Sequence, residues 1–157
     1  MKSYLNSVMM KKVNLKYSFI YIGIVLMSFS ALSQETVIIV NNDNPVETMK
    51  SIEVKLYYMR KVKQVWPDLG EQIVPVGSSV DSPARKLFLS KIMKLSSKQL
   101  DAYFKQRQFA NGEALPPALG SDEEIIKYVS ENKGAIGYVS QAAFSASGGV
   151  VKSVLSQ

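Results

Sequence analysis

The sequence predicts an α/β fold in three layers, an α/β/α sandwich in which helices cover both faces of one sheet. Short runs of strand-forming residues alternate along the chain with segments of helical periodicity, the order typical of such folds. The runs 36–40 (TVIIV) and 135–139 (AIGYV) are apolar at nearly every position, which indicates strands buried on both faces. The chain has 157 residues, the length of about one domain.

The first predicted strand, 36–40, is followed by the turn-forming run 41–45 (NNDNP), which ends it. Ser51 is of a residue type that caps helices, so a helix is expected to begin there. Apolar residues at helical spacing predict one buried stripe on this helix, made of Ile52, Leu56 and Met59.

Residues 66–70 (WPDLG) predict a loop, with Trp66 anchored in the core at its entrance. A strand at 73–76 (IVPV) follows. Its Pro75 indicates the edge of a sheet or the end of a strand, because proline cannot donate a ladder hydrogen bond. Residues 77–81 are expected to form another loop.

A second helix is predicted to begin at Ser82 and Pro83, since a capping hydroxyl followed by proline is a favoured helix start. Its buried face is expected to consist of Leu87, Phe88, Ile92 and Leu95. Ser96 or Ser97 caps the next helix. The apolar residues expected on that helix are Leu100, Tyr103 and Phe104.

Residues 111–120 are rich in glycine and proline and predict a loop. The last predicted helix begins with a capping box at 121–124 (SDEE), whose acids suit a helix N-terminus. Its apolar face is expected to contain Ile125, Ile126 and Val129. Lys133 and Gly134 are expected to end it, with the glycine as C-cap.

The last two strands are predicted at 135–139 and 150–155. Gly137 within the first suggests a close backbone approach or a bulge. Gly148 and Gly149 form a flexible joint before the second. No internal repeat or second domain boundary interrupts this order of elements.

The N-terminus has the pattern of a secretory signal. Three lysines between positions 11 and 16 precede an apolar run at 19–27 (FIYIGIVLM), and the small residues Ala31 and Ser33 follow it. This order of charged, apolar and small residues predicts cleavage before Gln34. The apolar run is shorter than the roughly 20 residues that span a bilayer. We therefore expect a signal peptide at 1–33, a single domain at 34–157, and a periplasmic or secreted protein without a membrane span.

Two alternatives stay open at this end of the chain. The apolar run can instead serve as an uncleaved N-terminal anchor. Translation from Met9 or Met10 would give a signal of more usual length.

Composition excludes several classes of function. Apolar residues make up 46% of the chain and charged residues 20%, which argues against disorder. There is no cysteine and no histidine. Disulfides, zinc fingers, cysteine nucleophiles, Ser-His-Asp triads and histidine-ligated metals are therefore excluded.

No catalytic motif stands out. Ser130 and Lys133 match S-x-x-K, the nucleophile motif of penicillin-binding enzymes, but the S-D-N and K-T-G motifs that accompany it are absent. The hydrolase motif G-x-S-x-G and the glycine-rich motifs that bind phosphate are also absent. A lysine at a helix C-terminus is expected from the helix dipole alone. We expect neither an enzyme nor a cofactor nor a metal site.

The positive net charge of the chain comes partly from the predicted signal peptide. Of 19 basic and 13 acidic residues, four lysines and no acid lie in 1–33, so residues 34–157 keep 15 and 13, a net charge of +2. Basic residues at 60–63 lie among aromatic residues, a combination that can bind single-stranded nucleic acid. In a secreted chain of small net charge we expect no nucleic-acid partner.

The best candidate binding site is the junction at 77–85 (GSSVDSPAR). A helix N-terminus offers unpaired N–H groups to an anion. Ser82 adds a hydroxyl, Ala84 and Arg85 add their N–H groups, and the Arg85 guanidinium can bind an oxyanion in bidentate fashion. Asp81 would repel a fully ionised anion unless it accepts a proton from it. In the alternative interpretation, Ser82 only caps the helix and Arg85 is a solvated surface charge.

The order of several segments resembles one lobe of the type II periplasmic solute-binding proteins, in particular short relatives of the phosphate ABC transporter substrate-binding family. The stretch 54–66 is similar to a helix followed by I-F-x-G-K-x-x-x-W, with Lys61 at the lysine, Arg60 in place of the glycine and one residue added before Trp66. Residues 66–70 resemble W-P-D-G with Leu69 inserted, and the strand at 73–76 matches the one before the ligand helix. The other similar segments are S-[GP]-x-R-x-x-F at 82–88, Y-W…F-x-G at 102–112 and G-A-I-G-Y-V at 134–139.

The departures from this family concern the ligand. Its full-length members hold an oxyanion between two lobes, and this chain has the length of one. Its ligand helix often carries S-G-T with an arginine four residues earlier. Here Pro83 and Ala84 follow Ser82, and Ser78 stands in the arginine position. The resemblance therefore supports the fold better than tight binding.

The resemblance implies non-catalytic, weak binding of phosphate or a similar oxyanion through Ser82, Ala84 and Arg85, with a membrane transporter or envelope protein as partner. The alternative is a module that keeps the lobe fold, binds no ligand, and docks a protein partner in the envelope.

Overall fold

The computed structural model describes residues 35–62 and 64–155. The predicted signal sequence and its cleavage site lie outside these residues. None of the helices within the described ranges is long and apolar enough to cross a membrane.

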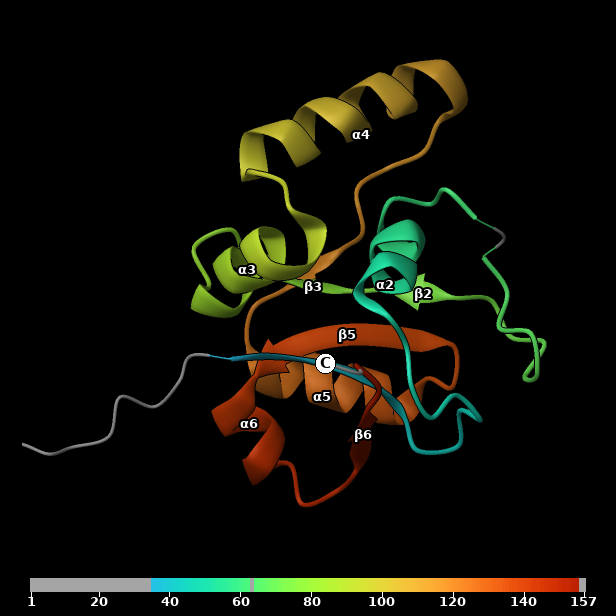
Figure 1. The fold of residues 1–157 in the computed structure, drawn as a ribbon, viewed down its shortest axis with the longest axis vertical. Helices are drawn as coiled ribbons and strands as arrows, with labels where there is room; N and C mark the ends of the chain where they lie inside the picture. The colour runs from blue at the N-terminus through green and yellow to red at the C-terminus, as the bar shows by residue number, and fades with distance from the viewer. Residues whose placement is uncertain (1–34, 63, 156–157) are drawn as a thin grey trace, which may run out of the picture. The chain divides into compact units, whose positions relative to one another are not determined.

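A four-stranded mixed sheet forms the centre of the domain (Figure 1). Its order is β2-β5-β1-β6, with bounds β1 Thr36–Asn41, β2 Val74–Pro75, β5 Ala135–Ser140 and β6 Val151–Ser153. β1 is antiparallel to both β5 and β6, whereas β2 runs parallel to β5 at the edge. The edge position of Pro75 is as predicted, because no further strand needs its missing N–H.

Helices cover both faces of this sheet, which confirms the three-layer prediction (Figure 1). One face carries α2, α3 and the π-helix η1, with α4 packed outside them, and the other face carries α5 and α6 (Figure 1). Their bounds are α2 Ser51–Tyr58, α3 Pro83–Leu87, η1 Phe88–Met93, α4 Ser97–Asn111, α5 Asp122–Glu131 and α6 Gln141–Ala146.

The two central strands contribute to a hydrophobic core on each face. Ile38 and Tyr138 belong to the core under α2 and η1, while Ile39 and Val139 belong to the core under α5. Successive side chains of a strand point to opposite faces. The unbroken apolar runs of β1 and β5 are therefore explained, because both faces are covered.

A second, two-stranded sheet joins segments that were expected to be loops. β3, Gly77–Ser78, pairs in parallel with β4, Ala118–Leu119. β3 follows β2 after a single residue, Val76. The Val76 N–H still donates to the Ile136 carbonyl in the first sheet, whereas the Gly77 N–H donates to the Pro117 carbonyl. Two-residue strands carry no alternation of apolar and polar residues, so the sequence pattern gave no signal for them.

The prediction for α2 was wrong in its cap and correct only in part for its buried stripe. The N-cap is Lys50, whose N–H donates to the Glu53 carboxylate at 2.6 Å. Of the predicted stripe, Met59 is buried, Leu56 is half-buried and Ile52 is 56% exposed. The helix also buries Val54 and Tyr58. The Tyr58 hydroxyl donates to the Val76 carbonyl at 2.8 Å, which holds this side of the helix against the sheet.

The cap of α3 is as predicted, but the buried face that follows is wider than expected. Ser82 is the N-cap and proline is the first helical residue. The predicted Leu87 and Leu95 are only half-buried, while the buried residues are Phe88, Leu89, Ile92 and Met93. Because the chain passes from α-helix into π-helix at Phe88, the wider turn brings adjacent pairs onto the buried side.

The helix α4 begins after Ser96, whose hydroxyl accepts the Gln99 N–H at 3.2 Å. Leu100 and Phe104 are buried as expected, while Tyr103 is half-buried and donates its hydroxyl to the Met59 carbonyl.

The helix α5 begins as predicted and ends differently. Ser121 accepts the Glu124 N–H, but the Glu124 carboxylate accepts from Gly120 rather than from the cap itself. Its C-cap is Asn132 in extended conformation, so Gly134 is not the cap. A Cβ on Gly134 would overlap the Gln72 carbonyl oxygen, which explains the glycine by close packing of two backbone segments.

The chain after β5 contains a helix that the sequence analysis missed. The helix α6 is capped by Ser140, and the turn that follows has positive φ at Gly148 and Gly149. The final strand β6 is shorter than the predicted 150–155.

Candidate anion-binding site

The predicted anion site lies at the N-terminus of α3, where Ser82 is already engaged. Its Oγ accepts the Arg85 N–H at 3.4 Å. The hydroxyl proton of Ser82 remains available for an anion, but the Arg85 N–H is directed at the cap. An anion would therefore compete with Ser82 for that group.

The backbone of Ala84 is hydrogen-bonded to the first strand of the sheet. The residue is buried, and its carbonyl accepts the Thr36 Oγ1 hydroxyl at 3.0 Å. This bond connects α3 to the start of β1. Ala84 is the second residue of the helix, a position whose N–H has no acceptor within the helix.

Arg85 is not the solvated charge of the alternative interpretation. The residue is only 5% exposed, and its Nε is buried without a hydrogen-bond partner. No carboxylate among the described residues lies within 4.0 Å of its guanidinium. A buried cation without a paired carboxylate is costly in free energy, so it favours an anion or strong acceptor beside it.

Tyr138 lies beside Arg85 and was not singled out by the sequence analysis. Its oxygen accepts the Ser78 N–H at 3.1 Å. Burial raises the pKa of its hydroxyl, and the bond from Ser78 and the nearby Arg85 guanidinium only partly oppose this rise. Tyr138 therefore keeps its proton at neutral pH, and no hydrogen bond recorded for the described residues uses that proton.

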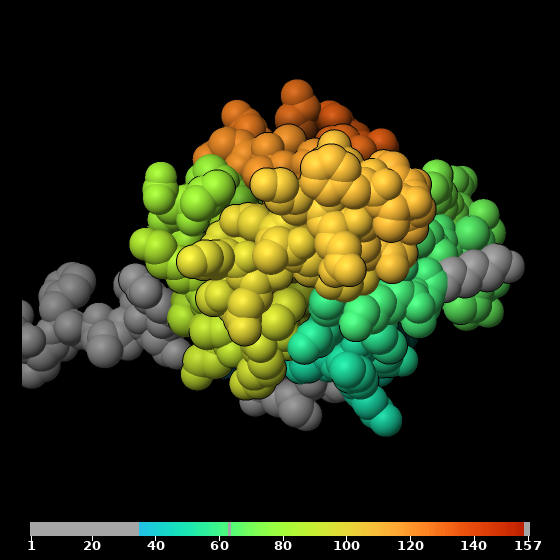
Figure 2. Space-filling model, turned by 90° about the horizontal axis from the view of Figure 1, so that it is seen from above, coloured from blue at the N-terminus to red at the C-terminus, as the bar shows by residue number. Residues whose placement is uncertain are grey.

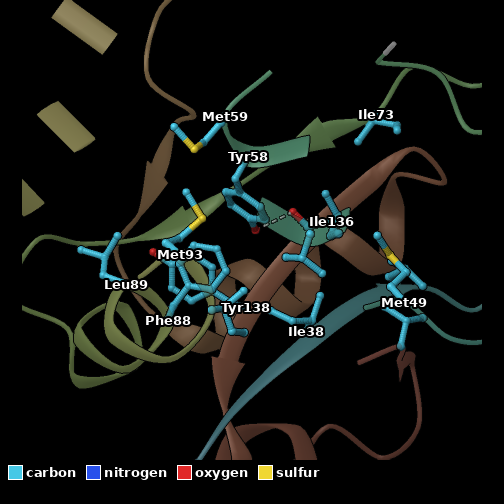
Figure 3. Packing of buried hydrophobic residues seen from close by; sticks show 14 of the residues in the cluster. Ile38, Met49, Tyr58, Met59, Ile73, Phe88, Leu89, Met93, Ile136 and Tyr138 are labelled. Carbon is cyan, nitrogen blue, oxygen red and sulfur yellow. Dashed lines mark hydrogen bonds between the residues drawn. The ribbon is translucent and has the colours of Figure 1, made fainter. Parts of the chain in front are cut away.

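Aromatic packing fixes the orientation of Tyr138. Its ring stacks on Phe88 of η1 with centroids 4.0 Å apart and planes 7° apart. Tyr58 packs against both rings (Figure 3). The hydroxyl is therefore positioned by the core rather than by solvent.

A small cavity lies against these groups. It has a volume of about 20 Å³, and Arg85, Tyr138, Gly77 and Phe88 are among its lining residues. Such a space holds about one water molecule. The cavity is too small for a whole phosphate ion, and Ser82 and Ala84 are not among its lining residues.

The structure joins Ser82 to the Arg85 backbone through the helix cap, and it places the Arg85 side chain near Tyr138, whose oxygen accepts the Ser78 N–H. The signal for Tyr138 in the sequence is its side-chain hydroxyl, which lies within a predicted strand whose other residues are apolar. Asp81 is exposed at the same junction.

The S-x-x-K motif at Ser130 and Lys133 does not form a reactive pair. Ser130 donates its hydroxyl to the Lys127 carbonyl, and Lys133 forms an ion pair with Asp43 at 2.9 Å. Within residues 35–62 and 64–155, no group of three acidic side chains is placed to hold a metal ion.

Comparison with known proteins finds similarity of fold. No family model matches the sequence, and no curated protein matches it significantly. An ABC-type phosphate transport receptor from Vibrio cholerae is 21% identical, with a TM-score of 0.59 over 77% of this chain and 45% of the receptor. A protein described as a phosphate ABC transporter substrate-binding protein with bound phosphate, from Clostridium perfringens, is 23% identical, with a TM-score of 0.57 over 78% and 45%.

A third similar structure, PstS from Borrelia burgdorferi, is 14% identical, with a TM-score of 0.60 over 79% of this chain and 48% of PstS. The chain therefore spans a little less than half the length of these proteins. Their fold is similar to this domain over most of its length, which confirms the single-lobe resemblance at the level of fold.

Proposed function

We propose that this chain is an extracytoplasmic, non-catalytic binding protein for phosphate or a similar oxyanion. The observation that carries the proposal is the buried Arg85 guanidinium, which has no paired carboxylate and lies beside the protonated Tyr138 hydroxyl. The Ser82 hydroxyl, the Ala84 N–H and the Arg85 guanidinium are hydrogen-bond donors, which is what an oxyanion requires. Asp81 at the same junction is exposed and would repel a fully ionised anion. The similarity of fold to phosphate-binding proteins supports this ligand class.

The proposed contacts are the Ser82 hydroxyl, the Ala84 N–H and the Arg85 side chain, with Tyr138 as an additional donor. Charge-assisted hydrogen bonds contribute about 1.5–3 kcal/mol each. With one lobe, water and salt weaken the bonds on the open side. We expect an affinity in the high-micromolar to millimolar range, about −4 to −6 kcal/mol.

Calorimetric titration with phosphate and sulfate at low salt tests the proposal. We expect weak binding that Ser82→Ala and Arg85→Gln each reduce. Ser121→Ala is the matched control, because it removes the same kind of cap from α5, costs a similar free energy of about 1 kcal/mol, and leaves the anion site intact. Absence of heat and of thermal stabilisation at millimolar anion would refute anion binding.

A second function is favoured by the small size of the cavity, about 20 Å³. In this function the domain keeps the lobe fold and docks a protein partner in the envelope. Failure of both anions to bind, with the variant proteins fully folded, would support it.

Export is part of the proposal. The signal pattern before Gln34 predicts removal of residues 1–33. Mass spectrometry of the protein recovered from the producing cells should show a chain that begins at Gln34. A mature chain that retains Met1 or Met9 and stays in the membrane would contradict cleavage.

A further inference from the structure

A cluster of cations is organised around Tyr103, away from the anion site. We call it the Tyr103 cluster; its members are Arg60, Lys61, Tyr103, Arg107 and Glu113. The Tyr103 hydroxyl donates to the Met59 carbonyl at 2.9 Å and so ties α4 to the end of α2. Figure 2 shows this face, with α4 in yellow beside the segment that follows α2 in green.

The ring of Tyr103 positions two of the cations. Lys61 Nζ lies 5.6 Å and Arg107 Cζ lies 5.8 Å from the ring centroid. Cations at such distances are attracted by the π-face of the ring. The two charges are therefore held on one side of the domain.

Arg60 has an unusual backbone conformation. Its φ is +51°, and its N–H and that of Lys61 donate to the carbonyls of Tyr57 and Leu56. This is the Schellman arrangement at a helix C-terminus, where glycine is favoured because a side chain is strained. An arginine here costs stability relative to glycine, so its guanidinium is a functional candidate.

The cluster carries excess positive charge. Its one carboxylate, Glu113, pairs with Arg107 Nε at 2.5 Å. Arg107, and more weakly Arg60, lower the pKa of Glu113. Arg60 and Lys61 form no ion pair with any residue of the described chain. Three cations and one anion give a net charge of +2, equal to the net charge of residues 34–157.

An apolar groove adjoins the cluster across the last turn of α2. It has a volume of about 520 Å³, and its apolar lining includes Leu56, Tyr57, Val62 and Trp66. The Glu53 carboxylate also lines it and accepts the Lys50 N–H, so the groove suits an apolar side chain and not an acidic one. Val62, which directly follows Lys61, is 39% exposed at its edge. The groove is large enough for an apolar side chain of a bound segment.

We propose that the Tyr103 cluster and this groove dock an acidic segment of a partner protein, with an apolar side chain of that segment in the groove. Glu113 shows that the cluster accommodates a carboxylate, since Arg107 already pairs with one. A protein segment supplies carboxylates and an apolar side chain together, which matches a cationic cluster beside an apolar groove.

The test is fluorescence anisotropy with a labelled peptide that contains one leucine followed by four glutamates. Arg60→Gly and Lys61→Gln should each weaken binding about fivefold to tenfold, and added salt should weaken it for the unmodified protein. Arg60→Gly should fold at least as well as the parent, because glycine suits the positive φ. A thermal melt checks that the variant is folded, because the Arg60 side chain is half-buried and its Nε is inaccessible to solvent.

Lys94→Gly is the matched control. Lys94 is the other non-glycine residue with positive φ among those described, at +52°, and it lies outside the cluster. This variant removes the same charge from the same backbone conformation, so we expect its peptide affinity to stay within twofold of the parent.

Three results would overturn the proposal. These are no peptide binding at millimolar concentration, equal losses in Arg60→Gly and Lys94→Gly, or binding to phosphatidylglycerol vesicles but not to the peptide. Ser82→Ala should leave peptide binding unchanged, so failure of the anion site and failure of this docking surface are distinguishable.

Discussion

Gly137 shows how a single residue position can be set by the element packed above it. It lies in the middle of β5, and a Cβ there would meet Ile125 Cγ2 at 2.7 Å and Val129 Cγ2 at 3.1 Å. Both side chains belong to α5 and are buried. The glycine lets this helix approach the sheet closely, as the sequence suggested.

Gly137→Ala should lower the free energy of unfolding by about 1–3 kcal/mol, because the added methyl overpacks the core between α5 and the sheet. Urea denaturation measures the change. Gly120→Ala is the control, since its Cβ would meet only the movable end of the Glu124 side chain, at 3.2 Å. Equal losses in the two variants would contradict close packing of α5 as the cause.

At the scale of elements, the α3–η1 segment connects the candidate anion site to the core. Phe88 is 2% exposed, stacks on Tyr138 and packs against Tyr58 at a centroid distance of 4.7 Å. The same segment begins at the Ser82 cap. Packing of Phe88 therefore helps to position both the cap and the Tyr138 hydroxyl.

Phe88→Ala should cost about 3–5 kcal/mol of stability, a large part of a typical total of about 5–15 kcal/mol. Thermal and urea denaturation midpoints measure this loss. Leu87→Ala, the neighbouring half-buried position, should cost clearly less. An unchanged midpoint in Phe88→Ala would mean that this face of the segment does not contact the sheet.

At the scale of the whole molecule, buried tyrosines link stability to alkaline pH. Burial raises the pKa of Tyr58 well above its ordinary value and also raises that of Tyr138. Below pH 10 both hydroxyls stay protonated in the folded and unfolded states, so they add no pH dependence. Above pH 10 the unfolded chain releases these protons while the folded protein keeps them, so stability falls.

The slope can reach about 1.4 kcal/mol per pH unit for each tyrosine, where the unfolded chain has lost the proton and the folded protein keeps it. Urea midpoints between pH 9 and pH 11.5 measure it. Tyr138→Phe should show a shallower fall in stability above pH 10 than the parent, because one of the two buried hydroxyl protons is then absent. The same slope in this variant and the parent would contradict the assignment.

The sequence alone determined much of the architecture. Unbroken apolar runs indicated strands buried on both faces, and both β1 and β5 are such strands. Serine caps at Ser82, Ser96 and Ser121 lie where expected. These features depend on neighbours within a few residues along the chain, which is why local patterns could predict them.

Other features depended on tertiary structure. The buried side of α2 and the π-turn of η1 follow from how each packs against the sheet, and the pairing of β3 with β4 joins segments about 40 residues apart. For the candidate site, the sequence indicated Ser82 and Arg85 but could not show that Arg85 is buried beside Tyr138. Burial and the pairing of distant groups are properties of the assembled core, because only packing decides which polar atoms lose water and which partners replace it.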